Sequence, residues 1–241
     1  MIEGVVALAA FLLLAFLRIP LAFAMGLVGF AGIVHKIGWP GANSMVGQVF
    51  YETGFQYTLS VIPLFVVMGN LIVRARITEE LFDAAYAFLG HFRGGLAIST
   101  VAASAGFGAV CGSSVATSAT FAKVAFPPMQ RFGYGGGFAA ATIAASGTLG
   151  IIVPPSVMMV LYGVMTENSI GKLFAAGLLP GLLTMLIMFA TVYVIGVVKP
   201  EVCPAGAHAS WRQRFTALKG IWPVLVLFTL VMGGIYGGIF T

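Results

Sequence analysis

Residues 94–122 read GGLAISTVAASAGFGAVCGSSVATSATFA, and this stretch decides what kind of fold the chain can adopt. It contains no charged residue, and 21 of its 29 residues are Gly, Ala, Ser or Thr. Helices that face lipid are rich in large apolar side chains, whereas small residues let helices pack closely inside a membrane protein. We therefore expect this stretch to lie inside protein, with Gly112-Ser113-Ser114 near its middle.

The composition of the whole chain indicates a membrane protein. Of its 241 residues, 60% are hydrophobic and only 8% are charged, against about 25% charged in an ordinary soluble domain. This excludes a soluble enzyme, a nucleic-acid-binding protein, a disulfide scaffold and a disordered regulator. Unbroken apolar blocks exclude an outer-membrane barrel, because barrel strands alternate polar and apolar residues. The expected fold class is an all-α polytopic membrane protein.

The apolar blocks predict a regular series of helices. The first three spans are expected at residues 4–17, 19–34 and 59–73. Polar residues recurring every four positions predict an amphipathic interfacial helix at residues 41–57. A second amphipathic helix is expected at residues 78–89, with Thr78 as its N-cap.

The 35 uncharged residues from 132 to 166 predict a broken helix. One continuous helix of this length would be about 52 Å long, too long for a hydrocarbon core of about 30 Å. Two glycines and two prolines between Ser146 and Ser156 are expected to interrupt it. A regular span at residues 173–198, a polar basic loop at 199–219 and a span from residue 220 follow.

The distribution of basic residues predicts that residues 94–126 form a re-entrant hairpin. If this segment enters and leaves on one side, ten of the twelve Lys and Arg residues share that side, and only Lys36 and Lys172 lie opposite. If it crosses once, the split is five against seven. Because basic residues are retained on the cytoplasmic side, we expect a hairpin that opens from the cytoplasm, and an N-terminus in the periplasm.

The hairpin tip and the broken helix together predict an ion and anion site. Non-helical backbone survives at membrane depth only where it is buried in protein or lines a cavity. Unpaired carbonyls can coordinate Na⁺, and helix N-termini favour a substrate carboxylate. The alternative is that Ser and Thr satisfy only their own backbone while Gly allows packing. No metal-ligand spacing or phosphate loop is present, and Gly112-Ser113-Ser114 lacks the G-x-S-x-G pattern of hydrolases, so an enzyme is not expected.

Four motifs resemble the large membrane subunit of TRAP (tripartite ATP-independent periplasmic) transporters, the DctM-like permeases. They are AVCGSSVAT at 109–117, AASGTLGIIVPPS at 144–156, IPLF at 62–65 and GGIYGGIFT at 233–241. The resemblance implies a Na⁺-driven elevator carrier built from two inverted repeats in the bacterial inner membrane. It implies import of an organic acid, such as a C4-dicarboxylate or a sialic acid. It also implies two partners, a small membrane subunit and a periplasmic substrate-binding protein.

The resemblance also assigns site residues, with Na⁺ as the coupling ion and no other cofactor. The expected sodium-binding residues are Gly112, Ser113, Ser114, Ser146, Gly147, Thr148, Leu149 and Gly150. The expected substrate-binding residues are Ser114, Val115, Pro155 and Ser156.

Members of this family are about twice as long as this chain. We therefore expect an N-terminal half that holds the first repeat and, at 220–241, the first span of a truncated second one, and that does not transport alone. The expected parts are scaffold spans at 1–76, an arm helix at 77–92, a transport region at 93–198 and a cytoplasmic loop at 199–219. Two alternatives stay open: a Na⁺–dicarboxylate elevator symporter without a binding protein, and a structural membrane fragment that does not transport.

Overall fold

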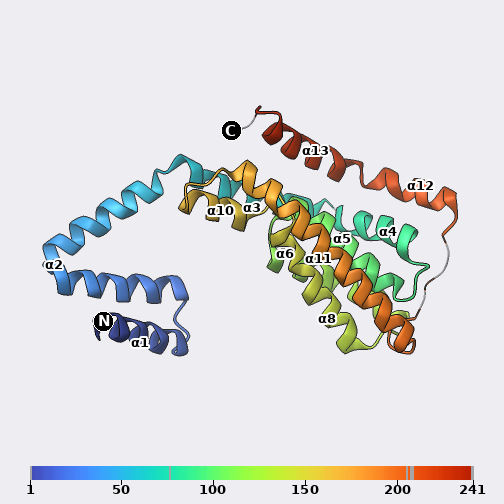
Figure 1. Ribbon diagram of the computed structural model, residues 1–241, viewed down its shortest axis with the longest axis horizontal. Coiled ribbons are helices and arrows are strands. Elements are labelled where there is room, and N and C mark those ends of the chain that lie inside the picture. The colour runs from blue at the N-terminus through green and yellow to red at the C-terminus, as the bar shows by residue number, and fades with distance from the viewer. Residues whose placement is uncertain (1, 76, 205, 207–208, 240–241) are drawn as a thin grey trace. The chain divides into compact units, whose positions relative to one another are not determined.

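The computed structural model describes residues 2–75, 77–204, 206 and 209–239, and these residues form helices joined by turns, with no strand among them (Figure 1). Contacts divide the chain into two compact units, Met1–Leu59 and Ser60–Thr241. Each unit is described by itself below.

The first unit consists of α1 (Ile2–Phe16) and α2 (Leu21–Gly54). An exposed ion pair joins the two helices, with Lys36 Nζ 3.2 Å from a carboxylate oxygen of Glu3. The backbone of α2 is not helical at Gly38, where φ is +77° and ψ is 168°. Glycine adopts this conformation without steric penalty. A kink at Gly38 thus divides α2 between the expected span and the expected second helix, and the position of that second helix in the membrane interface stays a prediction.

A short 3-10 helix, Tyr57–Ser60, ends at the first residue of the second unit. Eleven α-helices follow among the described residues. These are α3 (Val61–Arg74), α4 (Ile77–Leu89), α5 (Gly95–Cys111), α6 (Ser114–Val124), α7 (Phe126–Arg131), α8 (Gly136–Gly147), α9 (Leu149–Ile152), α10 (Val157–Met165), α11 (Ile170–Val198), α12 (Trp211–Gly220) and α13 (Trp222–Tyr236). Helix α3, which the sequence assigned to the scaffold, packs in the same unit as the transport region.

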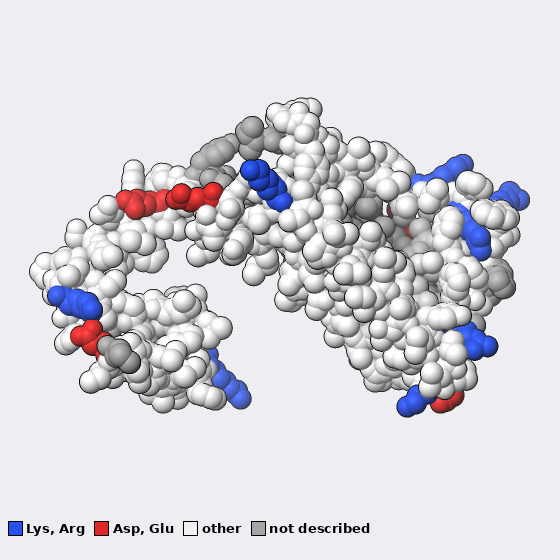
Figure 2. Space-filling model, in the orientation of Figure 1, with Lys and Arg blue, Asp and Glu red and all other residues white. Residues whose placement is uncertain are grey.

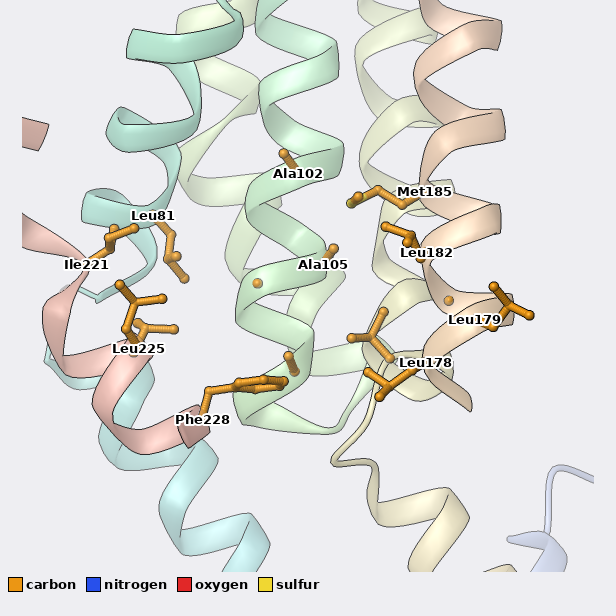
Figure 3. A pocket seen from close by; sticks show the side chains of 15 residues that line it. Leu81, Ala102, Ala105, Leu178, Leu179, Leu182, Met185, Ile221, Leu225 and Phe228 are labelled. Carbon is orange, nitrogen blue, oxygen red and sulfur yellow. The ribbon is translucent and has the colours of Figure 1, made fainter. Parts of the chain in front are cut away.

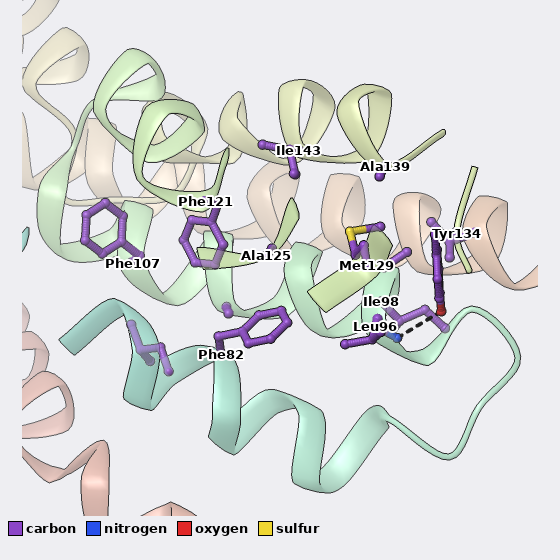
Figure 4. Close-up of a cluster of buried hydrophobic side chains, with 14 of the residues drawn as sticks. Phe82, Leu96, Ile98, Phe107, Phe121, Ala125, Met129, Tyr134, Ala139 and Ile143 are labelled. Carbon is purple, nitrogen blue, oxygen red and sulfur yellow. Dashed lines mark hydrogen bonds between the residues drawn. The ribbon is translucent and has the colours of Figure 1, made fainter. Parts of the chain in front are cut away.

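Helix α5 lies at the centre of this unit, and 15 of its 17 residues are buried. This confirms the expectation for residues 95–111, whereas in α6 only Thr117 and Phe121 are buried. Helices α5 and α6 form a hairpin, because Phe107 packs edge-on against Phe121 with ring centroids 5.9 Å apart. At the open end of the hairpin, the amide of Leu96 donates to the hydroxyl of Tyr134 over 3.2 Å (Figure 4). The predicted helical hairpin is therefore present, and its entry from the cytoplasm stays a prediction.

Two helices are long and apolar enough to cross a membrane, α2 and α11. Two bent pairs also qualify, the α8–α9 segment with α10 at 42° and α12 with α13 at 52°. By length and composition, the described residues thus provide up to four spans, beside shorter apolar helices such as α1 and α5. The chain is a multi-pass membrane protein.

The interruption of the broken helix is shorter than the sequence indicated. Thr148 keeps a helical backbone, with φ −64° and ψ −24°, between α8 and α9. The non-helical backbone lies between Ile152 and Val157, around Pro154 and Pro155. A glycine costs a helix only about 1 kcal/mol relative to alanine, whereas proline removes a hydrogen-bond donor and clashes with the preceding turn. Pro154 and Pro155 therefore interrupt the helix, whereas Gly147 and Gly150 do not.

Two local expectations are wrong. Helix α4 begins at Ile77, so Thr78 is inside the helix, where its buried hydroxyl has no hydrogen-bond partner among the described residues. The segment 199–219, expected to be a loop, contains α12. Ser210 and Gln213 form a capping box at its start: the Ser210 hydroxyl accepts from the Gln213 amide, and the Gln213 side chain accepts from the Ser210 amide. The S-x-x-Q spacing is a sequence signal for this helix start.

Candidate functional site

Two residues with different backbone conformations, Gly112 and Ser113, form the tip of the α5–α6 hairpin. Gly112 ends α5 in the left-handed conformation, with φ +65°, which favours glycine. Ser113 is the N-cap of α6, and its hydroxyl accepts from the amide of Ala116 over 3.3 Å. The Ser113 carbonyl accepts from the amide and the hydroxyl of Thr117, at 3.0 and 2.7 Å. The motif thus forms a tight turn that exposes the beginning of α6.

This tip lies directly against the break of the α8–α10 helix. The amide of Val157 donates to the carbonyl of Gly112 over 3.4 Å. A Cβ atom on Gly112 would lie 3.0 Å from the Val157 nitrogen and 3.3 Å from the Pro155 oxygen. These distances are tighter than ordinary van der Waals contact, so glycine at this position lets the two non-helical segments meet.

The tip also contacts the helix before the break. A Cβ atom on Gly150 would lie 2.9 Å from the Ser113 oxygen. A Cβ atom on Gly147 would lie 3.2 Å from the Ser114 oxygen and would overlap the hydroxyl of Ser118. Five of the eight sodium-binding residues expected from the sequence, namely Gly112, Ser113, Ser114, Gly147 and Gly150, are therefore brought together.

The other three expected sodium-binding residues are placed differently. The Ser146 hydroxyl faces α5, where it accepts from Ser104 Oγ over 3.1 Å and donates to the Ile143 carbonyl. Thr148 is exposed, and its hydroxyl donates to the Ala145 carbonyl over 2.7 Å. Leu149 is fully buried in an apolar cluster, so only its backbone can serve a ligand.

A cavity of about 450 Å³ opens beside the hairpin tip. Ser114 and Val115 line it, and the Val115 side chain is 77% exposed. The other two expected substrate-binding residues, Pro155 and Ser156, are buried behind its wall. The full lining is Val66, Gly69, Asn70, Val73, Cys111, Gly112, Ser113, Ser114, Val115, Ala116, Ile151, Val157 and Met158.

Two helices begin at this cavity. Helix α6 starts at Ser114 and α10 starts at Val157, and both residues line the cavity. A helix N-terminus carries about half a positive charge and unpaired amides that favour an anion. None of the described lining residues is charged. The Ser156 hydroxyl at the start of α10 is buried and has no hydrogen-bond partner among the described residues. The cavity wall therefore offers helix dipoles and hydroxyls in place of charged side chains.

Three polar residues near this site were not among the residues expected from the sequence. Asn70 of α3 lines the cavity, Ser118 of α6 contacts Gly147, and Ser104 of α5 bonds to Ser146. Asn70 had a usable signal, since a single polar residue inside an apolar span often marks a functional site. Ser104 and Ser118 had none, because they stand among many other small polar residues in the 94–122 stretch.

A second cavity of this unit has a different character. It measures about 590 Å³ and lies between α4, α5, α11 and α13 (Figure 3). Apolar side chains such as Leu182, Met185 and Phe228, together with two glycines, form its described lining. This cavity offers no polar side chain to an ion or a carboxylate, so the hairpin tip is the better candidate site.

Comparison with known proteins gives one consistent result. Residues 8–241 match the family described as tripartite ATP-independent periplasmic transporter, DctM component. The chain is 43% identical to a C4-dicarboxylate TRAP transporter large permease protein of Pseudomonas aeruginosa, over 79% of this chain and 44% of the relative. It is 37% identical to an ectoine TRAP transporter large permease protein of Halomonas elongata, over 95% of this chain and 53% of the relative.

A third relative is the sialic acid TRAP transporter large permease protein of Vibrio cholerae, 33% identical over 95% of this chain and 52% of the relative. The chain spans about half the length of the curated relatives it matches. These relatives are transporter permeases and not enzymes.

Proposed function

Since this chain belongs to the DctM component family of tripartite ATP-independent periplasmic transporters, we propose that it takes part in Na⁺-coupled import of an organic acid. In this proposal the chain supplies one sodium site and one half of the substrate site of a large permease subunit. Both are formed by the hairpin tip with the broken helix.

One observation carries this proposal: α6 and α10 begin at the same cavity, where the Gly112 carbonyl accepts from the Val157 amide. In the lipid core, polar backbone that is not satisfied within the protein is costly. Here two non-helical segments lie together, and the hydroxyls of Ser113 and Ser114 with the backbone oxygens of the tip would be the ligands of the cation. Oxygen ligands of this kind suit a hard cation such as Na⁺.

The same cavity supports a carboxylate as the transported group. The two helix N-termini direct their positive ends to one place, and an anion is the ligand that such ends favour. The relatives are named for C4-dicarboxylates, sialic acid and ectoine, all of which carry a carboxylate. We therefore propose that the carboxylate of the substrate lies at the start of α6 and α10, beside Ser114 and Val115.

The family membership supports the remaining parts of the proposal. The partners would be a small membrane subunit and a periplasmic substrate-binding protein. The location would be the bacterial inner membrane, with the N-terminus in the periplasm. Substrate would cross by an elevator motion of the hairpin-containing part, driven by the sodium gradient.

Cysteine protection tests the proposed site on this chain. The native thiols are first replaced, as Cys111→Ala and Cys203→Ala, and Val115→Cys is then introduced on the cavity wall. The purified protein in nanodiscs is treated with a thiol reagent in Na⁺ or K⁺, with and without succinate. We expect Na⁺ to slow labelling severalfold and succinate to slow it further only when Na⁺ is present.

A matched control is Leu183→Cys in the same background, because Leu183 is exposed on α11 and lies outside the cavity lining. Its labelling rate should be the same in all four solutions. Equal labelling of Cys at position 115 in Na⁺ and K⁺ would contradict the proposal.

A further inference from the structure

Helix α12 presents an aromatic face that is largely exposed, although the Arg214 guanidinium lies 5.0 Å from the centre of the Trp211 ring. Trp211 and Phe215 are 69% and 62% exposed, and their ring centroids lie 6.4 Å apart. Leu218 continues the stripe one turn later, and exposed Trp222 follows at the start of α13. The spacing of four and three residues places Trp211, Phe215 and Leu218 along one side of α12, and Trp222 lies beyond the 52° bend that separates α12 from α13.

A neighbouring side of α12, which carries Arg214 and Gly220, packs against α4. The Arg214 guanidinium donates to the Ala87 carbonyl over 3.2 Å and lies 5.8 Å from the centre of the Phe88 ring. A Cβ atom on Gly220 would lie 3.4 Å from the Glu80 side chain. Because α4 holds this side, the aromatic face has a fixed direction away from the unit.

Basic residues accompany the aromatic face, and α12 contains no acidic residue. At 100° per residue, Arg212 and Lys219 stand next to each other beside Phe215, and both are exposed. Neither forms an ion pair with a described residue, although Glu79 and Glu80 lie on neighbouring α4. Figure 2 shows Lys and Arg gathered over the end of the second unit that carries α12.

We propose that α12 lies flat on the cytoplasmic membrane surface and binds the headgroups of acidic phospholipids. Trp211 and Phe215 would enter the boundary between headgroups and acyl chains, where aromatic rings are enriched in membrane proteins. Arg212 and Lys219 would contact the lipid phosphates, whose negative charge complements theirs. The 52° bend between α12 and α13 suits a chain that turns from the surface into the membrane.

This inference goes beyond the proposed transport site, since it concerns a different surface and a different ligand. If the proposal holds, α12 anchors the segment between α11 and α13 to the lipid surface. An acidic lipid surface would then hold α4 in place through Arg214 and α12.

Quenching of a single tryptophan by brominated lipid tests the proposal. Trp39→Phe and Trp222→Phe leave Trp211 as the only tryptophan of the chain. The protein is placed in bilayers of phosphatidylcholine with 30% phosphatidylglycerol, with bromine on either one lipid or the other. We expect quenching per mole of brominated lipid to be about fivefold stronger for phosphatidylglycerol, which corresponds to about one effective charge contact.

Charge removal supplies the decisive comparison. The double variant Arg212→Gln with Lys219→Gln should bring the quenching ratio of the two lipids close to one. The matched control Lys172→Gln removes a basic residue at the start of α11 and should leave the ratio unchanged. Raising NaCl to 0.5 M should lower the ratio by screening. Inorganic phosphate at 10 mM should not change it if lipid is the ligand.

Four results would overturn the proposal. A quenching ratio near one in the parent protein would remove the preference for acidic lipid. A ratio unchanged in the double variant would remove Arg212 and Lys219 from the binding. Absence of quenching by both lipids would show that Trp211 does not reach the bilayer, and competition by inorganic phosphate would show a site for a soluble anion.

Discussion

Gly108 of α5 and Gly150 of α9 meet backbone to backbone: a Cβ atom on Gly108 would lie 2.6 Å from the Cα atom of Gly150. The opposing atoms are backbone, so a larger residue at this point could be accommodated only by moving one of the two helices. This contact holds the hairpin against the helix that precedes the break, and it thereby sets where the tip lies.

Gly108→Ala should destabilise the protein and displace the tip. Overpacking of a close contact costs about 1–3 kcal/mol, and here the opposing atoms are backbone. We expect a lower melting temperature in detergent and loss of any stabilisation by Na⁺. Gly137→Ala is the control, because a Cβ atom there meets nothing within 4 Å. Equal melting temperatures for the two variants would show that the close approach is not structurally required.

Ser104 and Ser146 should be energetically coupled. Their hydroxyls are 3.1 Å apart and fully buried, and they join the first hairpin helix to α8. Hydrogen bonds between membrane helices contribute about 0.6 kcal/mol on average. A double-mutant cycle with Ser104→Ala and Ser146→Ala, measured by unfolding, should give a coupling free energy of about this size. If the two substitutions change the free energy of unfolding additively, the hydrogen bond between Ser104 and Ser146 does not contribute to stability.

The helical hairpin could be predicted from the sequence because its signals are local. Small residues and a Gly-Ser-Ser centre occur within residues 94–126, and the count of ten basic residues against two over the whole chain set its parity. The break at Pro154-Pro155 was predicted for the same reason. Its length was overestimated, since the sequence does not reveal that Gly147 and Gly150 serve contact with the hairpin and keep a helical backbone.

The partners of the hairpin tip could not be predicted from spacing. Asn70 comes from α3 and lies 42 positions before Gly112 in the sequence, and Ser118 meets Gly147 only after α6 and α8 have packed together. Helix α12 was missed because its composition is polar and basic, and apolar periodicity was the criterion for a helix. The capping box at Ser210 and Gln213 was the signal that would have found it.

Tyr134→Phe should loosen the open end of the hairpin. The Tyr134 hydroxyl accepts from the Leu96 amide and donates to the Pro204 carbonyl over 2.9 Å. Removing it leaves two polar groups without this partner, a loss of about 1–3 kcal/mol. The free energy of unfolding, measured in detergent, should fall by this amount at neutral pH.

The same residue predicts a pH dependence of stability. Burial raises the pKa of Tyr134 well above its ordinary value, although the hydrogen bond from the Leu96 backbone opposes this shift. A group whose pKa is raised in the folded state stabilises fully below its unfolded pKa, and this stability is lost as pH rises above about 10. Stability should thus not change through Tyr134 between pH 7 and 9. Above pH 10, Tyr134→Phe should lose less stability than the parent, and an equal loss would contradict this account.

The hairpin should return to the side of the membrane from which it starts. Arg93 precedes α5 and Arg131 ends α7, near the Tyr134–Leu96 contact at the open end of the hairpin. In a background with Cys111→Ala and Cys203→Ala, Arg93→Cys and Arg131→Cys should both react with an impermeant thiol reagent only from the cytoplasmic side. Reaction from opposite sides would show a single crossing and would reject the re-entrant topology.

The central claim is that the hairpin tip and the broken helix bind one Na⁺, and direct sodium binding tests it. Equilibrium binding of radioactive Na⁺ to the purified chain in nanodiscs should reach one ion per chain, with no competition by equimolar K⁺. Ser114→Ala, or Gly150→Ala at the tip contact, should weaken binding about tenfold, the cost of about 1.4 kcal/mol expected for a lost buried polar contact. Gly137→Ala should bind as the parent does. Absence of sodium binding by the parent, or unchanged affinity in both tip variants, would contradict the claim.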